Sequence, residues 1–176
     1  MDFFLADLRG VDLLEATLQK AILKRAKLDG ASLIGAQFEQ ADFEQAGLEG
    51  ADLREADLRE ANLQGANLKR ANLLGANLFM AELQEAQLQG ARLDNADLKG
   101  ADLSEANLEG ARLRGAKLDS AELTGTNLNG ADLMDAEGLT QDMLDEGHHR
   151  REDIAPSERG RGRSRGLNPT RHNTAN

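Results

Sequence analysis

Side chains that could act as nucleophiles, bases or metal ligands are scarce in this chain of 176 residues, which contains no Cys and only three His. Glu146, His148, His149 and Glu152 could together approach a metal ion, but they lack the spacing of a metal site, and His172 is distant in sequence. The Ser and Thr residues have no base beside them, so a nucleophile and its base cannot be assembled. We therefore predict no catalytic residue, no metal site and no cofactor.

Carboxylates are the one abundant reactive group, because 31 Asp and Glu stand against 21 Lys and Arg, for a formal net charge of −10. A carboxylic acid becomes a useful general acid when burial or a close like charge raises its pKa toward neutrality. Carboxylates that face water make poor general acids for this reason. The sequence therefore predicts a protein that is not an enzyme and whose acids matter as a charged surface.

The elements that position these side chains follow from a strict period of five. Every fifth residue from 3 to 133 is Leu or Phe, and the residue two before it is Ala except at Met1, Val11 and Thr126. On an α-helix such a period would distribute Leu around every face, and on a strand it would alternate Leu between the two faces. The chain must therefore turn within each pentapeptide, so that every Leu returns to one interior.

Four-sided coils satisfy this requirement. If each of the 27 pentapeptides makes one side of a square, twenty residues close a coil, and about seven coils stack at roughly the 4.7–4.9 Å spacing of neighbouring strands. Gly stands two residues after the central residue in 12 pentapeptides, where a sharp bend favours positive φ. Asp or Asn precedes the central residue in 15 of them, and such short side chains bond nearby backbone in turns.

The 27 consecutive units of the form Ala-(Asp/Asn)-Leu-x-x resemble the pentapeptide-repeat family, in the class that is common in cyanobacteria. The resemblance covers residues 1–137 and implies an all-β solenoid, a right-handed quadrilateral β-helix of about seven coils. Residues 138–147 resemble the short C-terminal helix that often caps such coils, with Thr140 as its N-cap and Gly147 at its end. We predict three parts: the β-helix over 1–137, the capping helix over 138–147 and a disordered tail over 148–176.

The predicted tail contains Arg159, Arg161, Arg163 and Arg165 in alternation with Gly or Ser, a composition typical of disorder. Its arginines lack interleaved aromatic residues, so we expect at most weak contact with nucleic acid. The first residues do not combine a basic segment with a long apolar run, and no later segment is long enough to span a membrane. A cytoplasmic location is the expectation, with no membrane partner.

The outward side chains can be sorted by the side of the square on which their pentapeptide lies. The first side consists of the pentapeptides centred on Phe3 and on every twentieth residue after it, and the second, third and fourth sides start in the same way at positions 8, 13 and 18. The first side carries eight acids but only two bases, Lys24 and Arg25. Its candidate binding surface, the acidic strip, consists of Asp42, Glu44, Glu82, Glu85, Asp102, Glu105 and Glu122.

The acidic strip has more than one interpretation. Some members of the pentapeptide-repeat family, the quinolone-resistance class, imitate duplex DNA and occupy a topoisomerase, and an acidic rod could engage a basic groove in the same way. The charges could instead serve solubility alone. The modest net charge and the bases on the other sides depart from the DNA-mimicking class. We therefore predict a non-enzymatic protein-binding or scaffolding solenoid with an unknown protein partner, and keep a DNA mimic that binds a topoisomerase as the alternative.

Two groups of outward apolar residues are further candidate contacts. The first, the apolar patch, is expected to meet near one corner and consists of Leu74, Phe79 and Met80. The second, the end contact on the first coil, consists of Phe3, Phe4 and Leu5. Clustered apolar side chains are either an interface or incidental exposure. Pairing of two first coils would give a homodimer, and side-by-side packing through the apolar patch is the rival arrangement.

Overall fold

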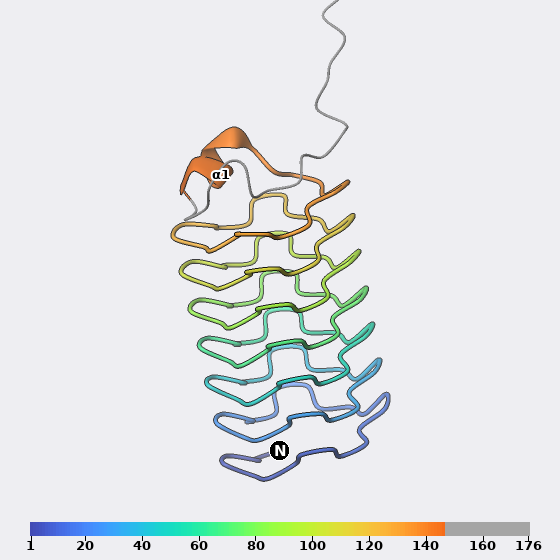
Figure 1. Cartoon of the computed structure of the whole chain (residues 1–176). Helices are drawn as coiled ribbons and strands as arrows, with labels where there is room; N and C mark the ends of the chain where they lie inside the picture. Colours follow the sequence, from blue (N-terminus) through green and yellow to red (C-terminus); the bar gives the residue numbers. More distant parts are fainter. Residues whose placement is uncertain (147–176) are drawn as a thin grey trace, which may run out of the picture.

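The computed structural model describes residues 1–146, which wind into a right-handed β-helix with the N-terminus at one end of the rod (Figure 1). Parallel bridges join residues that are twenty apart, from Asp2–Ile22 to Lys117–Glu137, and they recur at every fifth residue. Four pentapeptides therefore make one coil, and each bridge links a pentapeptide to the one directly above it. This stacking places the second residue of each pentapeptide in a vertical column on the outside of the rod.

The interior is filled by the central Leu or Phe of each pentapeptide and by the Ala that precedes it by two residues. From Leu18 to Leu133 these central residues are buried, whereas Phe3, Leu8 and Leu13 on the first coil are only partly buried. Phe38 and Phe43, on adjacent sides, pack edge to face with ring centroids 4.9 Å apart. The core is therefore a set of columns that run the length of the rod, and it becomes more exposed at the N-terminal end.

The pentapeptide at 61–65 shows how the backbone N–H groups are paired. The N–H groups of Leu63 and Gly65 donate to carbonyls of the coil above at 2.7 and 2.8 Å, and that of Asn62 donates to the coil below at 2.9 Å. The N–H of the alanine closes the preceding turn at 3.1 Å. The remaining N–H, of Gln64, donates to Oδ1 of Asn62 at 3.0 Å. The frequent Asp or Asn thus pairs the one backbone donor that the coils leave over.

The fifth residue of every pentapeptide has a positive φ, whether it is Gly or not. The 12 glycines at this position are joined by 15 other residues with φ between 53° and 59°. A left-handed conformation costs a non-Gly residue roughly 1–2 kcal/mol. The stacking of the coils therefore imposes the bend at each corner, and Gly lowers its cost without being required for it.

The chain leaves the last coil at Gly138 and enters the helix α1, Gln141–Glu146. Gly138 has a φ of 79°, and a Cβ atom at this position would overlap the backbone of Asp119. Thr140 caps the helix, because its Oγ1 accepts the N–H of Met143 at 3.3 Å. Leu139, Met143 and Leu144 pack against the core and so cover the C-terminal end of the columns. The predicted tail and Gly147 lie outside the described residues.

Candidate acidic binding surface

The seven residues of the acidic strip lie on the first side of the rod, in the third and in the fifth to seventh coils. Consecutive bridges place the second-position residues Glu82, Asp102 and Glu122 directly above one another. Glu85 and Glu105 occupy the adjacent corner column, and both are exposed, as are Glu82 and Glu122. The upper part of the strip is therefore a ladder in which each coil contributes acids to the same surface.

The strip differs from the rest of the rod in the pairing of its charges. Ten ion pairs join described residues, and nine of them lie on the second, third and fourth sides. The tenth, Lys24–Glu44, pairs one of the two acids in the lower part of the strip, which consists of Asp42 and Glu44. Within residues 1–146, no cation pairs with the five acids of the upper part, which are Glu82, Glu85, Asp102, Glu105 and Glu122.

Hydrogen bonds divide the strip into structural and available carboxylates. Asp42 accepts the N–H of Glu44 at 3.0 Å and an amide N–H of Asn62 at 3.2 Å, so it serves the turn of its own pentapeptide. Glu122 accepts the hydroxyl of Thr124. No described residue forms a hydrogen bond with the side chain of Glu82, Glu85 or Glu105. These three carboxylates are therefore the ones that a partner reaches without breaking an existing contact.

Asp102 is the best-supported charge in the ladder. Its Oδ2 accepts the Nε2–H of Gln84 at 2.6 Å, and its Oδ1 accepts the N–H of Ser104 at 2.9 Å. Partial burial raises the pKa of Asp102, but the hydrogen bonds from Ser104 and Gln84 outweigh that effect, and the net pKa lies below the usual value for Asp. The carboxylate is therefore ionised at neutral pH.

Leu74 differs from the other two members of the apolar patch in its surroundings. Leu74 lines a depression on the third side, and Phe79 and Met80 are not among the residues that line it. Phe79 is 39% exposed and Met80 53% exposed, and the Met80 side chain lies beside Gly100 of the next coil. Whether the three act together as a contact stays a prediction.

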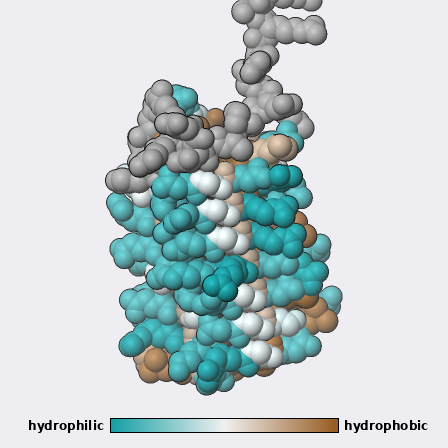
Figure 2. All heavy atoms as spheres, viewed as in Figure 1, coloured by the Kyte–Doolittle hydropathy of each residue, from teal (hydrophilic) through white to brown (hydrophobic). Residues whose placement is uncertain are grey.

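The three residues of the end contact have different surroundings. Phe3 packs against the hydrophobic core, whereas Phe4 and Leu5 are each about half exposed. Figure 2 shows that the visible face of the rod is mainly hydrophilic, with hydrophobic side chains gathered near its N-terminal end. Phe4 and Leu5 are therefore the more accessible members of this group, and Phe3 is partly buried.

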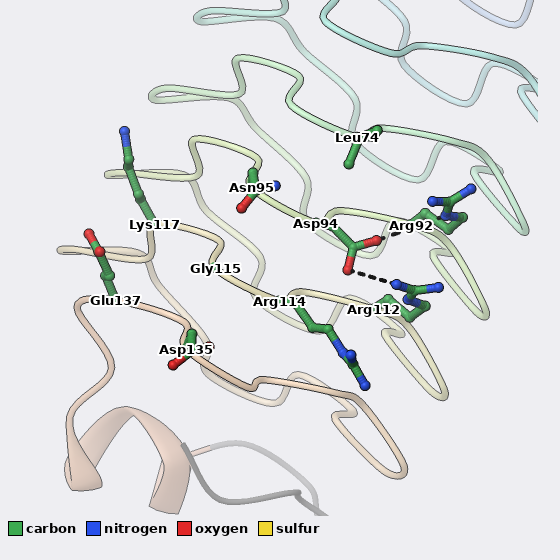
Figure 3. Close-up of a pocket in the computed structure, with 10 residues that line it drawn as sticks. All are labelled: Leu74, Arg92, Asp94, Asn95, Arg112, Arg114, Gly115, Lys117, Asp135 and Glu137. Atoms are coloured by element: carbon green, nitrogen blue, oxygen red, sulfur yellow. Dashed lines mark hydrogen bonds and ion pairs between the residues drawn. The ribbon is translucent and has the colours of Figure 1, made fainter. Parts of the chain in front are cut away.

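Sequence reasoning missed the depression on the third side, which has a volume of about 710 Å³. Asp94 and the arginines around it form its polar wall (Figure 3). The signal was present in the twenty-residue register, because Arg92 and Arg112 stand one coil apart with Asp94 beside them. No cluster of three His, Cys, Asp or Glu side chains in residues 1–146 is arranged to hold a metal ion. The predicted absence of a site at His148 and His149 concerns residues outside the described part.

No helix among the described residues is long and apolar enough to cross a membrane. The one helix that the structure describes, α1, has six residues.

Comparison with known proteins identifies relatives that share the repeat. HetL, a pentapeptide repeat protein involved in heterocyst differentiation regulation from the cyanobacterium Nostoc sp. strain PCC 7120, is 40% identical with a TM-score of 0.55, over 78% of this chain and 66% of HetL. Rfr23 from the cyanobacterium Cyanothece 51142 is 43% identical with a TM-score of 0.49, over 49% of this chain and 58% of Rfr23. This chain therefore spans about two thirds of HetL and less of Rfr23.

A third solved structure concerns the alternative function. Full-length QnrB1, a plasmid-mediated fluoroquinolone resistance protein, is 14% identical with a TM-score of 0.32, over 85% of this chain and 91% of QnrB1. A similarity of that size supports no statement about what this chain binds. The comparison with curated proteins gives no match. The family model for pentapeptide repeats matches residues 6–45, 46–79, 81–119 and 101–137, well over half of the sequence. The chain therefore belongs to the pentapeptide-repeat family.

Proposed function

We propose that this chain is a non-enzymatic binding rod that presents the upper acidic strip to a basic surface of a partner protein. The observation that carries the proposal is the ladder from Glu82 to Glu122, which has no ion pair within residues 1–146, beside three sides that hold nine of the ten ion pairs of the described residues. Negatively charged carboxylates on neighbouring coils repel one another, and binding to a cationic surface relieves that repulsion. The strip is thus suited to electrostatic recognition.

The backbone of the rod supports this role because it holds the carboxylates at fixed positions. Each coil is bonded to the coils above and below through several backbone hydrogen bonds per pentapeptide. A partner therefore meets charges whose spacing is already set, which lowers the entropy lost on binding. HetL, which is 40% identical, is involved in the regulation of heterocyst differentiation. A regulatory role through protein binding is the corresponding proposal for this chain.

The proposal is tested by neutralising the available carboxylates. A triple variant, Glu82→Gln, Glu85→Gln and Glu105→Gln, is compared with the wild type as bait for affinity capture at low salt, followed by calorimetry with the captured protein. The matched control neutralises three exposed acids of the other sides, which are Glu15, Glu55 and Glu109.

We expect the strip variant to lose the partner, the control to retain it, and the affinity of the wild type to fall as salt increases. Equal binding by both variants would show that the acidic strip is not the binding surface. If the wild type captures no protein, or only proteins that the strip variant also captures, the proposed function itself is contradicted.

The alternative, imitation of DNA, has one observation in its favour. The five upper acids lie on three coils of roughly 4.8 Å each, which gives one charge per about 3 Å of rod. Duplex DNA carries one charge per about 1.7 Å, and each of its strands one per about 3.4 Å. The strip therefore reproduces the density of a single strand over a short distance and falls short of the duplex. For this reason we place general protein binding first.

An assay with DNA gyrase distinguishes the DNA mimic from the general binding rod. A DNA mimic should inhibit supercoiling in a salt-sensitive manner, and Glu82→Lys combined with Asp102→Lys should relieve the inhibition. No inhibition at micromolar protein in low salt would remove the alternative and leave the binding rod untouched.

A further inference from the structure

The third side of the rod carries two arginines at equivalent positions of neighbouring coils. They do not belong to the acidic strip and play no part in the function proposed for it. Arg92 and Arg112 occupy the second position of consecutive coils and are joined by a parallel bridge. Neighbouring strands lie at roughly 4.8 Å, and like charges directly opposite at that distance destabilise a sheet. Their side chains are 47% and 49% exposed. An arrangement that costs stability needs a compensating group beside it.

Asp94 is the group that compensates, and its compensation is incomplete. Its side chain is only 8% exposed and lies between the two arginines (Figure 3). Oδ1 is 3.4 Å from Nη2 of Arg112, and Oδ2 is 3.8 Å from Nε of Arg92. Both distances exceed the roughly 2.7–2.9 Å of a well-formed charge-assisted hydrogen bond. Oδ2 is buried, yet no described residue donates a hydrogen bond to it.

The charges around the depression are balanced once Asp132, the partner of Arg114, is counted, so any positive excess lies on the arginine pair itself. Four cationic side chains line it, which are Arg92, Arg112, Arg114 and Lys117. Three acidic side chains line it, which are Asp94, Asp135 and Glu137. Arg114 is engaged by Asp132, and its guanidinium points away from Asp94 (Figure 3). Arg92 and Arg112 share the single carboxylate of Asp94, so one positive charge of the pair has no matching acid.

We propose that Arg92 and Arg112, which the backbone bridge holds one coil apart, form a binding site for a phosphate group, with Asp94 between them offsetting one of their two charges. Each guanidinium has five N–H donors in a fixed fork, and the contact with Asp94 occupies only a few of them. A phosphate has enough oxygens and charge to accept from both forks at once.

A phosphate suits this site better than a carboxylate does. Asp94 is itself a carboxylate held between the two arginines, and it forms one long hydrogen bond and one longer ion pair. A second planar group with a single charge would meet the same limitation, whereas a tetrahedral group with up to two charges reaches both forks. The group can come from a free phosphate or from a phosphorylated side chain, which share this chemistry. The site lies on the third side, so its test does not depend on the acidic strip.

Calorimetric titration of the full chain with inorganic phosphate, at constant ionic strength, tests the proposal. The variants Arg92→Gln and Arg112→Gln each remove one guanidinium and should weaken binding by about tenfold, because charge-assisted hydrogen bonds to the anion are lost. The matched control is Arg54→Gln on the same side. The Arg54 guanidinium already bonds Asp52 at 2.7 and 2.8 Å, so this variant should bind phosphate like the wild type.

A fourth variant distinguishes a binding site from a purely structural charge cluster. Asp94→Asn removes the charge that offsets the arginine pair, so the variant should bind phosphate more tightly, by about threefold or more, even if it is less stable. If this variant does not fold, as judged by circular dichroism, the two arginine variants still decide. Absence of saturable phosphate binding by the wild type, or an equal loss in Arg54→Gln, would overturn the proposal.

Titration with a phosphoserine peptide and its unphosphorylated counterpart identifies the source of the group. Tighter binding of the phosphopeptide than of inorganic phosphate assigns the site to a phosphorylated chain, and equal affinities assign it to a free phosphate. Equal binding of both peptides, with no response to inorganic phosphate, would contradict a phosphate site.

Discussion

Replacement of Leu83 by Ala tests the division of the chain into inward and outward residues. Leu83 is fully buried in the fifth coil, and the backbone around it is fixed by hydrogen bonds to the coil above at 2.7 Å and, through Glu82, to the coil below at 2.9 Å. Loss of three methylene-sized groups from the core costs about 2.4 kcal/mol at roughly 0.8 kcal/mol each. The bonded wall cannot move inward to fill the gap, so a cavity term raises the expected loss to about 3–5 kcal/mol.

The measurement is urea denaturation of the wild type and of three variants. Glu85→Ala, an outward change in the same pentapeptide, should alter the free energy of unfolding by under about 0.5 kcal/mol. Leu8→Ala on the first coil should cost less than Leu83→Ala, because Leu8 is only partly buried. Equal losses from Leu83→Ala and Glu85→Ala would refute the reasoning, since the period of five would then not separate core from surface.

Three further changes have defined outcomes. Gly138→Ala should destabilise the protein more than Gly30→Ala in the same denaturation assay, because a Cβ at Gly138 overlaps backbone whereas one at Gly30 meets nothing within 4 Å. Asp7 should titrate with a pKa of about 2 in NMR, since its side-chain hydrogen bond with Arg9 lowers its pKa. The stability that this interaction contributes is present above the unfolded pKa of about 3.9 and is lost as the pH falls toward 2. Replacement of Arg9 by Gln should return the Asp7 pKa toward its usual value. If two first coils pair, light scattering should report twice the monomer mass for the wild type and a monomer for Phe4→Glu, while a wild-type monomer would exclude that contact.

The sequence was sufficient to predict which residues point inward. The period of five defines the columns of Leu and Ala. It also places Asp42, and the Asp or Asn at the same position of other pentapeptides, beside the backbone N–H two residues later, which donates to the Asp or Asn side chain. The family match and the stacking of residues twenty apart agree with the predicted solenoid. Local preference was less informative at the corners. Met80 and Glu85 adopt the same positive φ as the glycines, because bonds between coils determine that conformation and the residue type does not.

Side-chain surroundings were the part that the pattern could not predict. Asp94 occupies an outward position, yet it is buried because it lies between the long side chains of Arg92 and Arg112. Leu74, which the sequence groups with Phe79 and Met80, also lines the depression beside Asp94, and the sequence pattern did not predict that depression. The period determines the direction of a side chain, whereas its burial depends on the rotamers of its neighbours one coil away. A pattern in sequence contains no information on those rotamers.

The stacking of residues twenty apart makes the length of the rod and the direction of its surfaces independently adjustable. Removal of four consecutive pentapeptides would shorten the rod by one coil and leave every remaining side chain on its own side. Removal of a single pentapeptide would keep each Leu inside, but would turn everything beyond it by a quarter of the circumference. The acids of the upper coils would then face the direction that another side faces now. A family built on this unit can therefore redirect a binding surface by a five-residue change that leaves the core chemically the same.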